Sequence, residues 1–248
     1  MKKLLQKIFI VSCATLSLDA VAQPTLTHAS NSPVVGDKFD LRNTNYVSPG
    51  SAGASQTWNL SAMSTTPAIT SYTAVTVAST PNASSYPSAN VSIMDGAGTY
   101  IYYNTSASAL LNNGVITGTV VFSYSNPETY LNYPFNYTNS FSDAWDCTFV
   151  NASLTFYRAG TSTVTADGWG TVTTPAGTFN NVMRVHLLQV YKDSCLSFPF
   201  NVNYSNDQYL WYRPGTHYPI ASVFSFTTGT SVTTNGSYLN NVLTGVSE

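Results

Sequence analysis

The sequence has 248 residues, of which 43% are hydrophobic, 13% are aromatic and only 8% are charged. Low charge by itself does not exclude disorder, but this aromatic content indicates a packed core and argues against a disordered chain. The formal net charge of −2, without any basic cluster, argues against nucleic acid and anionic membrane surfaces as partners.

The first 22 residues have the pattern of a signal peptide. A lysine-rich start is followed by an apolar run over residues 8–18 and by the small-residue cleavage site Ala20-Val21-Ala22. We therefore expect cleavage after Ala22 and one domain over residues 23–248. The alternative is a lipoprotein box ending at Cys13, although it leaves almost no apolar run before the cysteine. No later segment is apolar enough to predict a membrane span.

Strand patterns follow one another along the mature chain. Val, Thr, Tyr and Phe occur in short runs separated by Gly, Pro and Asn, without a period of 3.6 residues. Strands are predicted over residues 38–41, 56–60, 72–78, 90–95, 99–104, 115–124, 141–145, 147–159, 208–212 and 220–227, and within 163–191. This pattern predicts an all-β fold, built as a single large antiparallel curved sheet or half-barrel, with a two-sheet β-sandwich as the alternative.

Four connecting segments complete this prediction. Residues 23–36 are expected to be irregular, and residues 125–139 form an ordered loop packed by its own aromatic rings. Asn112-Asn113-Gly114 between apolar runs predicts a hairpin turn. Gly160-Thr161-Ser162 is expected to turn the chain into the next hairpin.

The best-specified element is a hairpin over residues 163–191. Thr174-Pro175-Ala176-Gly177 is a turn sequence, since proline presets the second turn position and glycine tolerates the exit. On the outgoing limb Met183, Val185 and Leu187 alternate with Arg184 and His186. The first three are predicted to be buried, and the two polar residues to share the opposite face.

Symmetry about this turn also predicts a pairing between charges. Arg184 would lie opposite Gly168, one step from Asp167, and an ion pair there would orient the two strands. A bulge at Asn180-Asn181 would change this register.

The mature chain keeps two cysteines, Cys147 and Cys195. An even pair in an exported protein predicts a disulfide, with two buried free thiols as the alternative. Neither a Cys-x-x-Cys pattern nor paired histidine spacing is present, so we expect no metal site and no cofactor.

Several segments together resemble secreted Bacteroidetes proteins of unknown function. They are Gly36-Asp37-Lys38-Phe39, the stretch 51–60, Tyr133-Pro134-Phe135, Asp167-Gly168-Trp169-Gly170-Thr171, residues 174–179, residues 182–185 and Leu210-Trp211-Tyr212. The resemblance implies export, usually with a C-terminal sorting tail used by the type IX secretion system, but no catalytic residues. The sequence ends at Glu248, about where such a tail would start, so the expected location is secreted or cell-surface, or periplasmic without the tail. Residues 174–179 also resemble half-barrel proteins related to periplasmic lipoprotein carriers.

Catalytic patterns are missing from the sequence, which contains neither a Gly-x-Ser-x-Gly elbow nor a His-Glu-x-x-His zinc motif. Asp143, Asp146 and Asp167 are the best carboxylate set for glycoside hydrolysis, although aspartates commonly serve turns or ion pairs. We therefore expect a protein that is not an enzyme.

The ligand-binding candidates are aromatic and polar residues of two predicted strands: Trp169, Arg184, His186, Tyr209, Trp211 and Tyr212. Rings with polar tips suit carbohydrate stacking and protein interfaces alike, and they also serve as core residues. Three functions remain open: a non-catalytic binding protein at or outside the cell surface, a carrier of a lipophilic ligand on a concave half-barrel face, and an unrecognised glycosidase. The predicted partner is an extracellular ligand, a carbohydrate or a lipid.

Overall fold

The computed structural model describes residues 23–195 and 197–241, so the predicted signal peptide lies outside the described residues. The described chain is almost entirely β-structure. The strands are β1 (Thr25–Leu26), β2 (Lys38–Thr44), β3 (Gly53–Asn59), β4 (Thr65–Val75), β5 (Val91–Met94), β6 (Thr99–Thr105), β7 (Ala109–Thr117), β8 (Val120–Asn132), β9 (Phe135–Asn136), β10 (Ser140–Asn151), β11 (Leu154–Thr174), β12 (Gly177–Cys195), β13 (Phe200–Tyr212), β14 (Ala221–Thr228) and β15 (Ser231–Asn241). The helical pieces are α1 (His28–Asn31), η1 (Val77–Ser79) and η2 (Ala83–Ser85).

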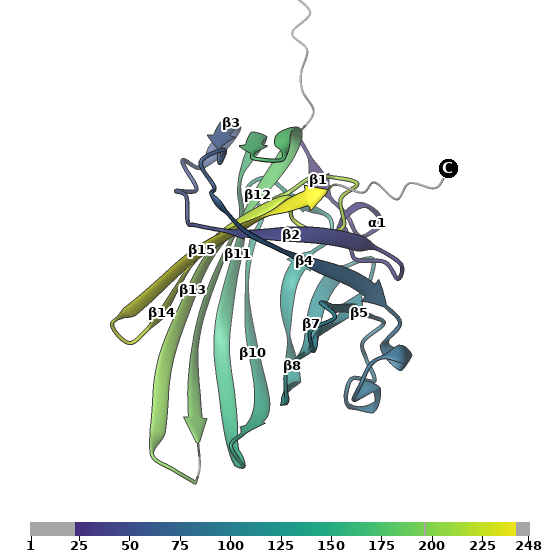
Figure 1. Cartoon of the computed structure of the whole chain (residues 1–248), viewed down its shortest axis with the longest axis vertical. Helices are drawn as coiled ribbons and strands as arrows, with labels where there is room; N and C mark the ends of the chain where they lie inside the picture. Colours follow the sequence, from purple (N-terminus) through teal and green to yellow (C-terminus); the bar gives the residue numbers. More distant parts are fainter. Residues whose placement is uncertain (1–22, 196, 242–248) are drawn as a thin grey trace, which may run out of the picture.

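Twelve of the strands close into one antiparallel barrel (Figure 1). The order is β10-β8-β7-β6-β5-β4-β2-β15-β14-β13-β12-β11, and β11 pairs again with β10. The short β3 adds to β11 in parallel, outside this ring. The predicted all-β class is confirmed, but the sheet is closed where a half-barrel would stay open. Closure gives the sheet an inner face that is enclosed and removes most unpaired strand edges.

The predicted hairpin is present as β11 and β12, and its turn is exposed at residues 175–177. Met183, Val185 and Leu187 are buried on the inner face, with 0%, 1% and 6% of their surface exposed. Arg184 lies opposite Gly168, as predicted, although the hairpin is not symmetric about the assumed centre. Next to the turn Thr174 pairs with Gly177, one residue away from the predicted register, and the bulge at Asn181 (φ +58°) restores that register farther along the strands.

The expected turn at Asn112-Asn113-Gly114 is wrong, because these residues lie within the continuous strand β7. The chain instead turns around Gly118, which has a φ of +58°. Gly114 is needed for a different reason: a Cβ there would lie 1.9 Å from the ring of Tyr86. The glycine therefore permits a close approach of an aromatic ring and not a turn.

Two other segments expected to connect strands are themselves strands. Residues 125–132 continue β8, with Pro127 at an irregularity where the register shifts. Residues 160–162 lie inside β11, and a Cβ on Gly160 would come within 2.4 Å of the Tyr191 Cβ. Close packing between β11 and β12 therefore requires glycine at position 160. This glycine does not mark a turn in the chain.

The predicted disulfide is not formed, and both cysteines are buried free thiols. Cys147 pairs with Arg158 of β11 from one side, and Cys195 pairs with Phe156 of β11 from the other. An intervening strand separates the two cysteines by about 10 Å in the sheet, since adjacent strands lie about 4.8 Å apart. A disulfide needs Cα atoms within about 7 Å, so this register forbids it.

The N-terminal segment covers one end of the barrel (Figure 1). β1 pairs with β9, and Leu26 is completely buried in the main core cluster. The Asn31 side chain donates hydrogen bonds to the backbone carbonyls of Arg213 and Thr216. Residues 23–36 were expected to be irregular, but these contacts order them across the barrel end.

A second core lies on the outer face of the barrel. Trp58, Leu60 and Met63 pack there with Val182, Trp211 and other residues of β11–β15. The segment around β3 therefore covers the outer face of β12 and β13, which explains how β13 carries aromatic rings on both faces. A smaller cluster on β6 and β7 contains Tyr102 and Ile116, packed with Tyr86 beside η2.

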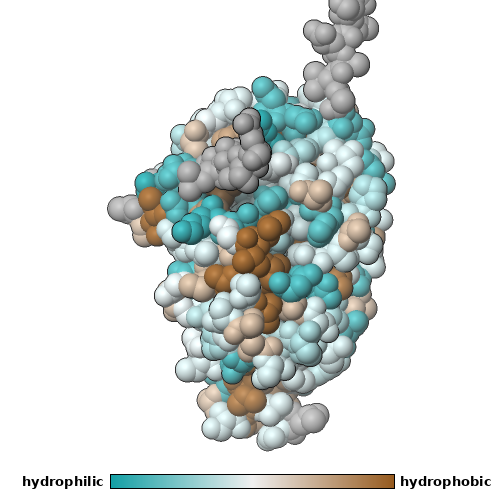
Figure 2. All heavy atoms as spheres, turned by 90° about the vertical axis from the view of Figure 1, so that its right-hand side faces the viewer, coloured by the Kyte–Doolittle hydropathy of each residue, from teal (hydrophilic) through white to brown (hydrophobic). Residues whose placement is uncertain are grey.

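The face shown in Figure 2 is mostly hydrophilic or neutral, with the largest group of hydrophobic residues at its centre and smaller ones at the left edge and near the bottom. Among the described residues, the helices are all too short or too polar to cross a bilayer.

Candidate functional site

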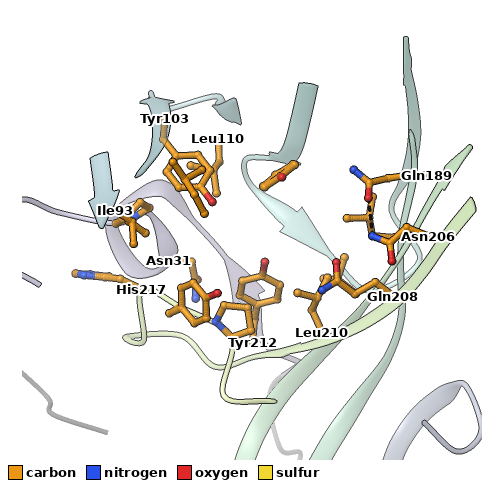
Figure 3. A pocket seen from close by; sticks show the side chains of 17 residues that line it. Asn31, Ile93, Tyr103, Leu110, Gln189, Asn206, Gln208, Leu210, Tyr212 and His217 are labelled. Atoms are coloured by element: carbon orange, nitrogen blue, oxygen red, sulfur yellow. Dashed lines mark hydrogen bonds between the residues drawn. The ribbon is translucent and has the colours of Figure 1, made fainter. Parts of the chain in front are cut away.

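The barrel contains a cavity of about 220 Å³ between β5–β8 on one side and β12–β13 on the other (Figure 3). Residues of α1 and of the connection between β13 and β14 border it at the covered end. The lining consists of six aliphatic residues (Ile93, Ile101, Leu110, Val185, Leu187, Leu210), four tyrosines (Tyr103, Tyr130, Tyr212, Tyr218), four carboxamides (Asn31, Gln189, Asn206, Gln208) and Pro33, His217 and Pro219.

Strand alternation places these side chains. On β12 the inward positions continue from Val185 and Leu187 to Gln189, and on β13 the paired positions are Leu210, Gln208 and Asn206. The inner face thus changes from aliphatic to amide along both strands, and on β13 it changes one pair earlier, since Gln208 lies opposite Leu187. The cavity has an apolar part near the covered end and a polar part deeper in the barrel.

The four tyrosines contribute hydroxyl groups to the cavity. Burial raises the pKa of each, and neighbouring tyrosine hydroxyls raise the pKa of Tyr103 and Tyr212 further. Tyr130 accepts a hydrogen bond from the Asn112 amide at 3.2 Å, so its own O–H is still free to donate. These phenols therefore remain protonated and act as hydrogen-bond donors at all ordinary pH values.

A chain of hydrogen bonds forms the polar part. Glu128 accepts from the Ser162 hydroxyl and from the Gln189 amide, and Gln189 accepts from the Asn206 amide at 2.7 Å (Figure 3 shows the last bond). Trp145 donates its indole N–H to Ser162 at 2.8 Å. The carboxylate thereby orients two of the four carboxamides that border the cavity, Gln189 directly and Asn206 through Gln189.

Glu128 is the most unusual ionisable group of the barrel interior. Only 1% of its surface is exposed, and this burial raises its pKa to about 7, with a further contribution from Asp143. The hydrogen bonds from Ser162 and Gln189 act in the opposite direction, because they favour the charged form. The group thus changes its charge near neutral pH.

A contact between a histidine and an aspartate lies at the rim of the cavity. His217 Nδ1 lies 2.8 Å from Asp37 Oδ2, and the same carboxylate oxygen accepts the backbone N–H of Val34 at 2.7 Å. About a third of the His217 side chain is exposed, at 31%. The histidine therefore links the N-terminal segment to the connection after β13.

Of the predicted ligand-binding residues, only Tyr212 lines the cavity. Trp169 packs, partly buried, against the main core cluster. The other four lie on the outer face of β12 and β13: Arg184, His186, Tyr209 and Trp211.

The outer four residues are held by contacts within the protein. Arg184 makes a two-bond ion pair with Asp167, with 2.8 Å and 2.9 Å between donor and acceptor atoms, which confirms the predicted pairing. His186 lies 2.6 Å from Asp207 and stacks on Tyr209, with ring centroids 4.4 Å apart. Trp211 is fully buried in the outer core. Their ligand-binding role stays a prediction.

The three aspartates considered for glycoside hydrolysis do not share one surface. Asp143 is on the inner face of β10, where it accepts the Thr129 backbone N–H, whereas Asp146 is on the outer face beside Ser125. Asp167 is bound to Arg184. The carboxylate that Asp143 influences electrostatically is Glu128.

Sequence reasoning missed Glu128, Gln189, Asn206 and three of the four cavity tyrosines. Extending the alternation of Val185 and Leu187 by one step would have placed Gln189 on the inner face. Glu128 was hidden because Pro127 made its segment resemble a loop.

No group of three or more His, Cys, Asp or Glu residues capable of holding a metal ion occurs within residues 23–195 and 197–241. Comparison with known proteins finds no matching family model, no matching curated protein and no matching solved structure. Functional inference therefore depends on the geometry of the cavity.

Proposed function

We propose that this protein is an exported, non-catalytic barrel that binds one small, largely apolar molecule inside the cavity. This is the carrier function among the three that the sequence left open. The observation that supports it most directly is the cavity of about 220 Å³, with six aliphatic side chains and four tyrosine rings in its lining. Ligand sites of proteins are typically concave and mainly apolar, with a few polar groups that set orientation.

The cavity volume bounds the size of the ligand. An apolar cavity of about 150 Å³ in another protein binds benzene. A cavity of about 220 Å³ therefore suits a molecule with one or two rings or a short branched chain. Transfer of such a molecule from water supplies about 25 cal/mol for each Å² of apolar surface that it buries.

The lining favours binding over nucleophilic catalysis. Among the described residues that border the cavity, none is a serine, threonine, cysteine or lysine, and the one histidine is paired with Asp37. A nucleophile needs an adjacent base, and this set of residues does not offer that combination.

Binding can be tested with naphthalene, a two-ring hydrocarbon, by the rise in melting temperature of the mature protein. A ligand that binds only the folded state at ten times its Kd adds about 1.4 kcal/mol to the free energy of unfolding. We expect the Leu210→Trp variant, which fills the cavity, to lose this rise. The matched control is Val190→Trp, which adds the same ring to an exposed position on the outer face of β12.

Absence of a shift in the wild-type protein, or an equal shift in Leu210→Trp, would contradict the proposal. Circular dichroism of both variants checks that they fold. Should Leu210→Trp fail to fold, Leu187→Phe provides a smaller filling of the same cavity.

A further inference from the structure

We infer that the cavity selects a neutral ligand that carries a carbonyl or similar oxygen acceptor, because phenol hydroxyls without a hydrogen-bond partner in the described chain belong to tyrosines that line it. The inference rests on the proposed function and specifies the chemical class of the ligand. It ranks two neighbouring classes, pure hydrocarbons and carboxylates, as weaker ligands of the same cavity.

The first argument is the state of two tyrosine hydroxyls. Tyr103 and Tyr212 are 6% and 8% exposed, and both border the cavity. In Figure 3 Tyr103 enters the cavity from β6 and Tyr212 enters from β13 on the facing side. Neither hydroxyl has a hydrogen bond to any part of the chain that the structure describes, so both O–H groups are free to donate to a molecule in the cavity.

Nearby groups add to this set of donors. Tyr130 receives the Asn112 amide on its oxygen and keeps its own O–H for the cavity. The Gln208 carboxamide also borders the cavity without a hydrogen-bond partner among the described residues. A ligand oxygen with two lone pairs can satisfy two of these donors at once, whereas a hydrocarbon of the same shape leaves them unsatisfied.

Charge explains why the acceptor should be neutral. Among the described residues, the lining contains no arginine or lysine, and Arg158 of the barrel interior, which does not border the cavity, donates from Nε and Nη2 to Asp193. Glu128 contacts the lining through Gln189, and Asp143 lies near it. A ligand carboxylate would lose its hydration without gaining a counter-charge, and it would be repelled by these acids.

The test uses three naphthalene derivatives of nearly equal shape: 2-acetylnaphthalene, 2-isopropenylnaphthalene and 2-naphthoate. They present a ketone, the hydrocarbon isostere and a carboxylate at the same position. Isothermal titration of the mature protein at pH 8 gives each Kd. We expect the ketone to bind about tenfold more tightly than the hydrocarbon, as for hydrogen bonds to buried donors, and the carboxylate to bind most weakly.

Each result has a separate meaning. If none of the three binds, the proposed function itself fails. If the hydrocarbon binds as tightly as the ketone, the protein still binds apolar molecules, but the inference about its ligand class is overturned. Tightest binding of 2-naphthoate overturns it as well.

Variants connect the selectivity to the phenols. In the double variant Tyr103→Phe, Tyr212→Phe, the preference for ketone over hydrocarbon should fall to about twofold or less, with hydrocarbon affinity unchanged. The control is Tyr238→Phe, which removes a hydroxyl from a tyrosine that is 5% exposed in the outer core. An undiminished preference in the double variant, or an equal loss in the control, would show that the cavity hydroxyls do not carry the selectivity.

Discussion

Two arginine–aspartate pairs lie on opposite faces of the same hairpin, and they differ in what they hold together. The Arg184–Asp167 pair is on the outer face, and the Arg158–Asp193 pair is inside the barrel. Each is formed by two hydrogen bonds between a guanidinium group and a carboxylate, the geometry for which arginine is best suited.

The outer pair holds a covering segment in place. Arg184 is 1% exposed and also donates to the carbonyls of Pro49 and Gly50, while its guanidinium lies 5.2 Å from the ring centre of Trp58. The charge therefore links the barrel to the segment that precedes β3. An interaction of this kind is costly to break, because the remaining charge would be buried without a partner.

The inner pair instead lies among aromatic rings of the neighbouring strands β8, β10, β12 and β13. The Arg158 guanidinium lies within 6 Å of the ring centres of Phe122, Phe149, Tyr191 and Tyr204, and 21% of its side chain is exposed. Burial lowers the pKa of Arg158, but the hydrogen bonds to Asp193 and the nearby acidic groups outweigh it, so the pKa is raised. The two pairs have the same geometry. The comparison indicates that the burial of each arginine, and the groups it contacts beyond its aspartate, determine how much each pair contributes to stability.

The largest effect is expected from Asp167→Ala, which leaves Arg184 buried without its carboxylate. We expect the free energy of unfolding to fall by about 3–5 kcal/mol, as for other buried ion pairs that lose one partner. Urea denaturation measures this change. The control is Asp207→Ala on the same outer face, where the aspartate side chain is 44% exposed and its partner is His186. Equal losses in the two variants would contradict the structural role of the outer pair.

Glu128 extends the comparison to a buried charge without an opposite charge. Its pKa is raised to about 7 in the folded protein, whereas glutamate ionises near 4.5 when unfolded. Between these two pKa values the folded state binds more protons than the unfolded state, so the free energy of unfolding falls as the pH rises. Well above pH 7 this loss of stability is complete and stays constant, because Glu128 is then charged in both states. Since each pKa unit corresponds to about 1.4 kcal/mol, Glu128→Gln should stabilise the protein by about 3 kcal/mol at pH 8.

The same substitution should have little effect near pH 4, where both states carry the protonated acid. Denaturation midpoints of the wild type and Glu128→Gln at pH 4, 6 and 8 measure the trend. A difference that is constant with pH would show that Glu128 does not titrate in this range.

The two faces of β12 give the third comparison. Leu187 is 6% exposed on the inner face, and Val190 is 53% exposed on the outer face. We expect Leu187→Ala to cost about 2–4 kcal/mol through lost transfer energy and an enlarged cavity. Val190→Ala and Thr173→Ala, on exposed or half-exposed positions, should cost less than about 0.5 kcal/mol. Similar midpoints for all three variants would mean that the inner and outer faces were assigned incorrectly.

Of the two arginine–aspartate pairs, the inner one should lose less stability, at about 1–2 kcal/mol for Asp193→Ala. Arg158 keeps partial contact with solvent and its position over four aromatic rings, so its charge is not left without compensation. Urea denaturation of Asp193→Ala and Asp167→Ala under the same conditions compares the stability lost with each pair. A larger loss for Asp193→Ala would reverse the comparison.

Local patterns were sufficient to predict the all-β class, the β11–β12 hairpin and the pair between Arg184 and Asp167. Each depends on residues close together in the sequence, where side-chain alternation and turn chemistry act directly. Predictions failed where a residue had two roles. Gly114 and Gly160 suggested breaks in the chain, but they allow rings or strands from elsewhere in the sequence to approach.

The sequence by itself determined which side chains of each strand share a face, because successive residues of a strand alternate whatever the sheet does. Only the tertiary structure decided which face is inside. The second pairing of β10, with β11 as well as β8, closes the ring, and the segment before β3 covers Arg184. Both depend on contacts between residues distant in sequence. For the same reason the cavity, the raised pKa of Glu128 and the separation of Cys147 from Cys195 follow from closure and register, which no local pattern specifies.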